Sequence, residues 1–163
     1  MNPYAKNLGE REALRVLIEV PDRLEALTSQ IGPAGMARSY EEGKWNLARI
    51  LSHLLHIELM FGTRFRQALT QDDLVVQPFD QDRWIEREPV SDGQTELQAL
   101  LALRRWNLAL WQILSPTDLE RTFLHPELGR MTIQDLLDLL AGHDLNHLSQ
   151  IERIAAHSSG GNI

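Results

Sequence analysis

Apolar residues recur every three or four positions in four long segments of this 163-residue chain. That spacing places the apolar side chains on one face of an α-helix. The helices predicted in this way cover approximately residues 8–30, 46–69, 95–114 and 133–157. Four long helices with hardly any strand pattern predict an all-α fold, and a four-helix bundle is its natural architecture.

The ends and faces of these helices can be predicted in more detail. Asn46 precedes the second helix and is a good residue to cap its first turn. Thr132, followed by Asp135, resembles a capping box at the start of the fourth helix. Pro21 lies inside the first segment, and because proline lacks a backbone N–H we expect it to kink or divide that helix. One face of the third helix is predicted to carry Leu100, Leu103, Trp106, Leu110 and Ile113.

Two connections between the helices contain predicted structure of their own. Residues 70–94 form a connection that is unusually long for a compact bundle, which is typical of functional loops. Within it, FDQDRWIER (79–87) is predicted to be a short helix that packs Trp84 against the bundle, and we interpret the segment as a lid. Before the fourth helix, TFLHPELGRMT predicts a small β-hairpin around residues 126–129.

The size and composition of the chain limit its class. We assign residues 1–157 to a single domain and residues 158–163, SSGGNI, to a flexible tail. No apolar run approaches the roughly 18 residues that span a bilayer, and the polar N-terminus has no signal-peptide core. We therefore expect a cytoplasmic protein without a membrane partner. A net charge of −7 argues against nucleic acid as a partner.

Histidines carry the candidate chemistry. The chain has no cysteine, so any metal site must use His, Asp or Glu. His143 and His147 are four residues apart and lie on one face of the fourth helix, where they could bind one metal ion. His53 shares a face of the second helix with Ile50 and Ile57, so it points inward if that face is buried. A third ligand from this helix would give a three-histidine site with open coordination positions, which is typical of catalytic metal sites.

The same histidines also have plainer explanations. A histidine pair at this spacing is often coincidental, and a single histidine on an apolar stripe is usually a hydrogen-bonded core residue. The H-E-x-x-H pattern of zinc proteases is absent, because Asp144 follows His143. From the spacing alone, a metal site and a plain helical bundle both stay open.

Other polar and aromatic residues can also be interpreted in two ways. Glu58 and Asp144 either orient the ligand imidazoles or lie on the surface. Arg83, Arg104 and Arg105 could bind a substrate carboxylate, although a solvated helix face is favoured for each. The tryptophans are predicted to lie in the core or in a pocket wall: Trp45, Trp84, Trp106 and Trp111.

Two stretches of the chain resemble the motifs of a known family. KWNLARILSHLLHIELMF (44–61) and GRMTIQDLLDLLAGHDLNHLSQIERI (129–154) are similar, in order and separation, to the two motifs of the DinB/YfiT-like superfamily. The resemblance implies a four-helix bundle, often a homodimer, with one divalent metal ion held by three histidines. By position these are His53, His143 and His147. One departure is Arg49, which stands where an acidic residue often completes the helix cap.

The resemblance also implies a class of activity. Members of the superfamily include metal-dependent hydrolases and transferases that use bacillithiol or mycothiol. We therefore expect a metalloenzyme, with Zn or Ni as its metal and a small-molecule substrate, acting as a thiol S-transferase or as a hydrolase. A low-molecular-weight thiol would be the co-substrate of the transferase.

A non-catalytic alternative uses the same residues. In it the histidines fasten two helices together in a metal-stabilised dimeric binding or stress-response protein. A closed site, with Glu58 or His56 as fourth ligand, would favour this alternative, and an open site would favour the enzyme.

Overall fold

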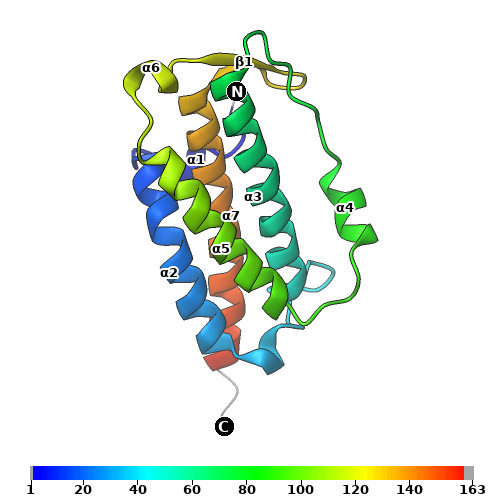
Figure 1. The fold of residues 1–163 in the computed structure, drawn as a ribbon. Coiled ribbons are helices and arrows are strands. Elements are labelled where there is room, and N and C mark those ends of the chain that lie inside the picture. The colour runs from blue at the N-terminus through cyan, green and yellow to red at the C-terminus, as the bar shows by residue number, and fades with distance from the viewer. Residues whose placement is uncertain (1, 160–163) are drawn as a thin grey trace.

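The computed structural model describes residues 2–159, which form a bundle of four long helices (Figure 1). The long helices are α2 (Ala13–Ile31), α3 (Leu47–Thr70), α5 (Gln94–Trp111) and α7 (Ile133–Ser159). The short elements are α1 (Ala5–Leu8), η1 (Pro33–Gly35), α4 (Gln81–Arg87), α6 (Pro116–Leu119), β1 (Thr122–His125) and β2 (Gly129–Thr132). The predicted fold class is confirmed.

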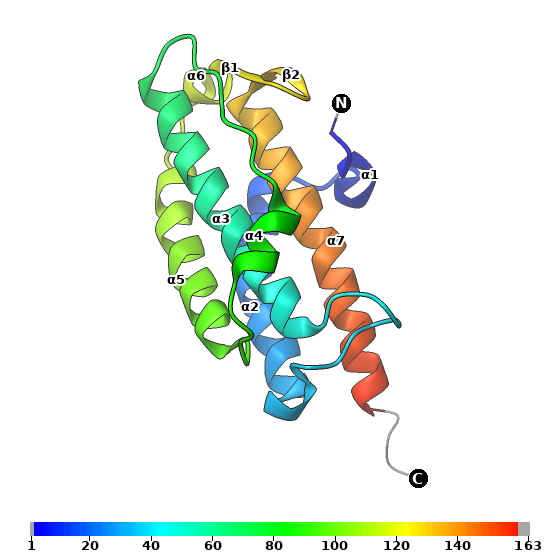
Figure 2. The same ribbon diagram turned by 90° about the vertical axis from the view of Figure 1, so that its right-hand side faces the viewer.

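The order of the helices around the bundle follows from their contacts. α2 packs against α7 and α5, and α3 packs against α5 and α7. α5 and α7 therefore occupy opposite corners (Figure 1). The chain runs in the same direction along α3 and α5, so it must return along the whole bundle between them. Residues 71–93, with α4, make this return along the outside of α3 (Figure 2). Topology therefore accounts for the length of this connection.

Local signals in the sequence determine where several elements begin. The Asn46 side chain accepts a hydrogen bond from the Arg49 N–H at 2.9 Å, as predicted for the cap of α3. Thr132 and Asp135 form the predicted capping box of α7, with bonds of 2.7 and 3.0 Å. The predicted hairpin is also present, with His125 paired to Gly129 across its turn.

Two ends of the predicted helices were wrong. α2 begins only at Ala13, because the chain turns at Gly9, whose φ of +60° suits glycine, after the separate helix α1. Pro21 was expected to kink or divide this helix, and it does not divide it, because α2 continues through Pro21 to Ile31. α7 is helical to Ser159, so the first two residues of the predicted tail are helical. The other tail residues, 160–163, lie outside the described part of the chain.

The predicted face of α5 was also wrong. Trp106 and Ile113 were expected inside, but 61% and 76% of their surfaces are exposed. The buried face is turned relative to the prediction and includes Arg104 and Asn107. The spacing of the apolar residues is compatible with either face of α5 being buried. Which face is buried depends on contacts with residues of other helices.

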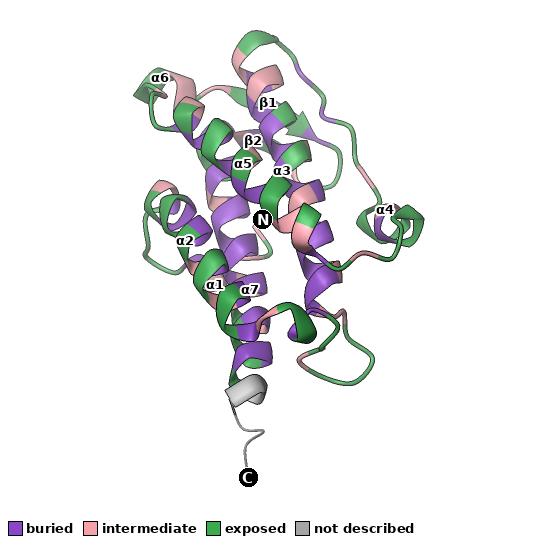
Figure 3. Cartoon of the chain, turned by 60° about the horizontal axis from the view of Figure 1, so that its bottom comes forward, coloured by how far each residue is buried: buried purple, intermediate pink, exposed green. Residues whose placement is uncertain are grey.

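The core fills the space between the four long helices, and buried positions follow their inner sides (Figure 3). The hairpin closes one end of the bundle, where Phe123 and Met131 are buried. α4 is mostly exposed and buries Ile85. Among residues 2–159, no helix is both long enough and apolar enough to cross a membrane.

The cap of α3 gives a direct test of the fold. Replacing Asn46 with alanine removes the acceptor for the Arg49 N–H, and we expect N46A to lower the free energy of unfolding by about 1 kcal/mol. N46D keeps an acceptor and should stay close to the wild type. Urea unfolding followed by circular dichroism measures both, and equal losses in the two variants would contradict the capping role.

Candidate metal centre

Three histidines from two helices meet inside the bundle. His53 lies on the inner face of α3, and His143 and His147 lie one turn apart on the inner face of α7. Their exposed fractions are 1%, 4% and 6%. One ring nitrogen of each can be chosen so that all three lie within 4.8 Å of one another. The Nε2 atoms of His53 and His143 are 2.9 Å apart. The structure thus brings together the three predicted residues, and metal binding by them stays a prediction.

The surroundings keep the imidazoles of His53 and His147 neutral. Burial, together with charge repulsion from the neighbouring histidines, lowers the pKa of His53 to about 2. Burial, followed by repulsion from His143, lowers the pKa of His147 to about 3. Only a neutral imidazole has the free lone pair that a metal ligand needs. His53 and His147 are therefore held in the form that can bind a metal ion at neutral pH.

Two further residues orient and cover the ligand rings. The Nδ1 atom of His147 lies 2.9 Å from the amide oxygen of Gln150. Because that oxygen can only accept a hydrogen bond, Nδ1 of His147 carries the proton. Nε2 of His147 then has a free lone pair with which it can bind a metal ion. The ring of Trp45 lies 5.2 Å from that of His53, between centroids, and shields it from solvent.

The N-terminal segment covers the third ring. The Tyr4 ring meets His143 edge-on, with 5.1 Å between the ring centroids. This approach depends on Gly142, because a Cβ atom there would lie 2.6 Å from the Tyr4 carbonyl oxygen. α1, which follows Tyr4, also packs against α7.

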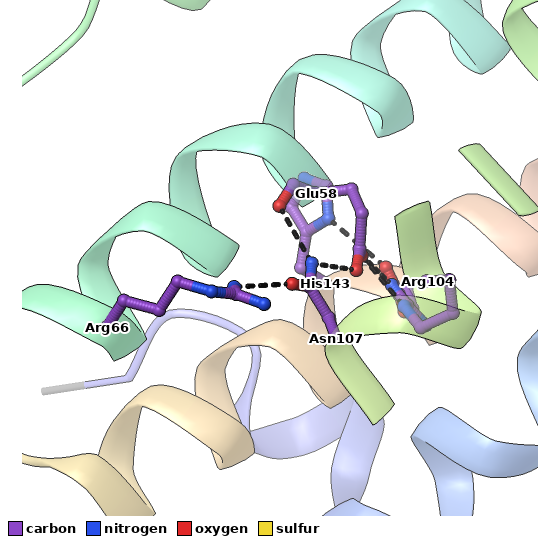
Figure 4. Close-up of polar contacts among 6 residues, drawn as sticks. Glu58, Arg66, Arg104, Asn107 and His143 are labelled. Carbon is purple, nitrogen blue, oxygen red and sulfur yellow. Dashed lines mark hydrogen bonds and ion pairs between the residues drawn. The ribbon is translucent and has the colours of Figure 1, made fainter. Parts of the chain in front are cut away.

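A network of buried charges lies beside the histidines (Figure 4). Arg104 on α5 has only 3% of its surface exposed and pairs with carboxylates from two other helices. Its Nη2 atom lies 2.6 Å from Glu58 Oε2 on α3 and 2.8 Å from Asp144 Oδ2 on α7. Asn107 donates a hydrogen bond of 2.7 Å to the other oxygen of Glu58, and Arg66 donates one of 2.7 Å to the side-chain oxygen of Asn107.

Two members of this network are held in their charged forms. Burial alone would lower the pKa of Arg104, but the two carboxylates outweigh it and raise that pKa. Burial would likewise raise the pKa of Asp144, but Arg104 and His143 outweigh it and lower that pKa. The guanidinium of Arg104 and the carboxylate of Asp144 therefore lie in the interior as ions, next to His143.

Several predictions about individual residues can now be resolved. The favoured solvated position of Arg104 was wrong, because its partners Glu58 and Asp144 hold it in the core. Arg83 and Arg105 are exposed, as expected. Of the tryptophans, Trp111 is buried, Trp45 and Trp84 are partly buried, and Trp106 is exposed and stacks under Arg66 at 3.7 Å.

Neither candidate fourth ligand joins the site. The side chain of Glu58 is bound by Arg104 and Asn107. His56 points to the return segment, where its Nε2 atom lies 2.9 Å from Glu88. Among residues 2–156, whose side chains the structure describes, the three histidines are the only group of three or more His, Asp or Glu residues that are close enough to share an ion.

Sequence reasoning missed two members of the site. Asn107 lies three residues after Arg104, on the same side of α5 as buried Leu100 and Leu108. The available signal was the helical spacing of Arg104 and Asn107, which places them on the same side of α5 as the buried leucines. The role of Tyr4 had no such signal, because α1 reaches α7 through tertiary packing alone.

The sequence profile of the DinB superfamily matches residues 17–151, which contain all three histidines. The chain belongs to the DinB superfamily. A superfamily relative in Oceanobacillus iheyensis, named "Putative metal-dependent hydrolase", is 29% identical over 89% of this chain and 85% of its own. A relative of the same name in Halalkalibacterium halodurans is 30% identical over 86% of this chain and 82% of its own.

A solved structure supports the fold independently. YfiT from Bacillus subtilis superposes with a TM-score of 0.81 and 24% sequence identity, over 90% of this chain and 86% of its own. It is described as a probable metal-dependent hydrolase with an unusual four-helix bundle topology. At this level of identity the likeness confirms the bundle fold of this DinB-superfamily chain.

Acid should destabilise protein that has been stripped of metal. His53 and His147 have pKa values far below the ordinary 6.5 in the fold, so below pH 6.5 the unfolded chain binds protons first. Stability is therefore unaffected above that pH and is lost progressively below it. At pH 5 we expect a loss of ~2 kcal/mol for each histidine relative to pH 7.5.

Urea unfolding in the presence of a chelator at the two pH values measures this loss. H53Q removes one of the two buried groups and should flatten the dependence, and combining it with H147Q should flatten the dependence further. Equal free energies of unfolding at pH 5 and 7.5 in the wild type would show that these imidazoles are not buried in neutral form.

Proposed function

We propose that this chain is a metal-dependent enzyme in which His53, His143 and His147 bind one divalent cation. The observation that carries the proposal is the meeting of three buried imidazoles from two helices, with nitrogens within 4.8 Å of one another. The names of the relatives in Oceanobacillus and Halalkalibacterium support it.

The residues at the site fit a metal ion by their own chemistry. Within this interior, Nδ1 of His53 and Nδ1 of His143 have no hydrogen-bond partner, while the two Nε2 atoms face each other at 2.9 Å. Converging lone pairs repel unless a proton or a cation lies between them. Three nitrogen ligands suit Zn and Ni among the divalent metals, and these are our proposed cofactors.

A cation held by three protein ligands keeps coordination positions open, and there it acts as a Lewis acid and favours the deprotonated form of a bound water or thiol. The chain's own residues set the conditions for this chemistry. Gln150 fixes the tautomer of His147, and the rings of Tyr4 and Trp45 limit the entry of bulk water. Both candidate reactions, hydrolysis and thiol transfer, need such a shielded electrophilic centre.

Attachment of the return segment to α3 is consistent with the proposed lid. Arg49 donates a hydrogen bond to the Ile85 carbonyl oxygen at 2.5 Å, and Arg64 donates one to the Gln77 carbonyl oxygen at 2.8 Å. With the bond between His56 and Glu88, these contacts join residues 71–93 to the helix that carries His53. We propose that a small-molecule substrate binds under this segment.

The non-catalytic alternative loses its expected fourth ligand. A closed structural site needs one more protein ligand, and both candidates are bound elsewhere, Glu58 by Arg104 and His56 by Glu88. This arrangement favours the open site of an enzyme over a metal fastening in a binding or stress-response protein.

Elemental analysis by mass spectrometry tests the proposed site. Tag-free wild-type protein supplied with Zn or Ni is expected to contain about one metal ion per chain, because three ligands from two helices converge on one point. H143A should lose the metal, because two ligands remain. H56A, a matched change of a buried histidine on α3, should keep it. Full metal content in H143A, or none in the wild type, would overturn the proposal.

Activity assays separate the two proposed reactions. Metal-loaded protein is tested against ester and amide substrates, and against an electrophile supplied with a low-molecular-weight thiol such as bacillithiol or mycothiol. Turnover that requires the thiol and disappears in H143A identifies a transferase, and turnover without it identifies a hydrolase. Metal-loaded protein that is inactive in both assays would favour the binding protein.

An apolar strip on α5 and on the turn that follows it supports a homodimer. Leu103, Trp106, Leu110 and Ile113 are spaced by three, four and three residues, which is the spacing of a seam between two helices. Trp106 and Ile113 are exposed within the described chain. Such a strip is self-complementary across a two-fold axis, so we propose that a second copy of the chain covers it.

Light scattering coupled to size-exclusion chromatography measures this association. The wild type is expected at twice the mass of one chain. W106E should be monomeric, because it places a charge at the centre of the strip. L59E, a matched change at an exposed leucine on α3, should stay dimeric. A monomeric wild type, or a dimeric W106E, would contradict this interface.

A further inference from the structure

The second nitrogen of His143 faces an unpaired carboxylate oxygen. Nδ1 of His143 and Oδ1 of Asp144 are both buried, and neither has a hydrogen-bond partner among the described residues. They lie 3.9 Å apart, about 1 Å beyond hydrogen-bonding distance. An imidazole nitrogen and a carboxylate oxygen make a strong pair when the nitrogen carries a proton. A small rotation of either side chain would therefore satisfy both atoms at once.

The neutral ring of His143 can carry its proton on either Nε2 or Nδ1. In the arrangement observed, the Nε2 atoms of His53 and His143 are 2.9 Å apart, so one of them donates a hydrogen bond to the other. Binding of a cation at Nε2 of His143 requires that this atom be free of its proton. The neutral ring must then carry the proton on Nδ1, which faces Asp144.

Asp144 is itself held in place by the charge network. Its other oxygen, Oδ2, lies 2.8 Å from Arg104, which is anchored in turn by Glu58 at 2.6 Å. Asp144 can therefore turn Oδ1 toward His143 without losing its ion pair.

We infer that Asp144 is a positioning residue for the metal centre: its carboxylate accepts the Nδ1–H of His143 and so directs the Nε2 lone pair of His143 at the cation. Arg104 and Glu58 act one step further away, by fixing the carboxylate. The three-helix network is then part of the metal centre, although only α3 and α7 supply ligands. This inference rests on the proposed three-histidine site.

The test compares two neutralised carboxylates that share the same arginine. D144N replaces the carboxylate with an amide that has a single accepting oxygen. Arg104 can only donate and binds that oxygen, so the NH2 group, which cannot accept, is left beside His143. E58Q removes an equal charge that does not contact this ring. D138N neutralises a carboxylate elsewhere on α7 that bonds Gln134, and it serves as the control. Zinc affinity is measured for each variant by competition with a chromogenic chelator. Circular dichroism confirms that each variant is folded.

D144N is expected to bind zinc 10–100-fold more weakly than the wild type, the effect typical of a carboxylate that orients a ligand histidine. E58Q should lose less, and D138N should match the wild type. Histidine NMR of zinc-loaded protein adds a readout that general destabilisation would not produce. The Nδ1–H resonance of His143 should shift in D144N and stay in place in E58Q.

Two results would overturn the inference. Equal zinc affinity in D144N and the wild type removes any role for Asp144, and an equal loss in E58Q assigns the effect to charge alone. If D144N does not fold, D144E replaces it, because it keeps both ion-pair charges but moves the oxygen away from His143. Unchanged affinity in D144E then overturns the inference. A wild type that binds no zinc or nickel overturns the metal centre itself, which distinguishes that failure from this one.

Discussion

The buried guanidinium of Arg104 is the constraint on which the rest of this structure depends. A charge taken out of water costs several kcal/mol unless it is paired, and Arg104 finds its pairs on two other helices, at Glu58 and Asp144. α5 and α7 stand at opposite corners of the bundle, so the network crosses its centre. A slip of one helix by a single turn would leave buried ions without partners. The network thus helps to set the register in which His53 meets His143.

The chain direction adds a second constraint. Because α3 and α5 run the same way, residues 71–93 must travel the length of the bundle outside it (Figure 2). Residues 71–93 bury Leu74, Val76 and Ile85, and Arg49 and Arg64 of α3 donate hydrogen bonds to their backbone. The helix that carries His53 therefore also holds the return segment, so the position of that segment depends on the position of α3.

Prediction from the sequence succeeded for features that depend on residues close together in the chain. The four long helices, the Asn46 cap, the Thr132 capping box and the hairpin were all correct, because each is encoded within a few residues. The three histidines were singled out by spacing and by family resemblance. The buried face of α5 and the role of Arg104 could not be predicted in this way. Their cause lies in Glu58 and Asp144, far away in the chain, and apolar periodicity alone does not say which side of a helix meets them.

The close contact between Gly142 and Tyr4 has a practical consequence for handling the protein. Tyr4 lies against the ring of His143, and α1, which follows it, packs on α7. A purification tag fused there would pull on the covering of the centre, and a preparation clipped within α1 would differ in the environment of one ring. Ser159, at the other end of α7, is 12 residues beyond His147, or about 18 Å along the helix. Fusion partners and surface-attachment chemistry belong at that end.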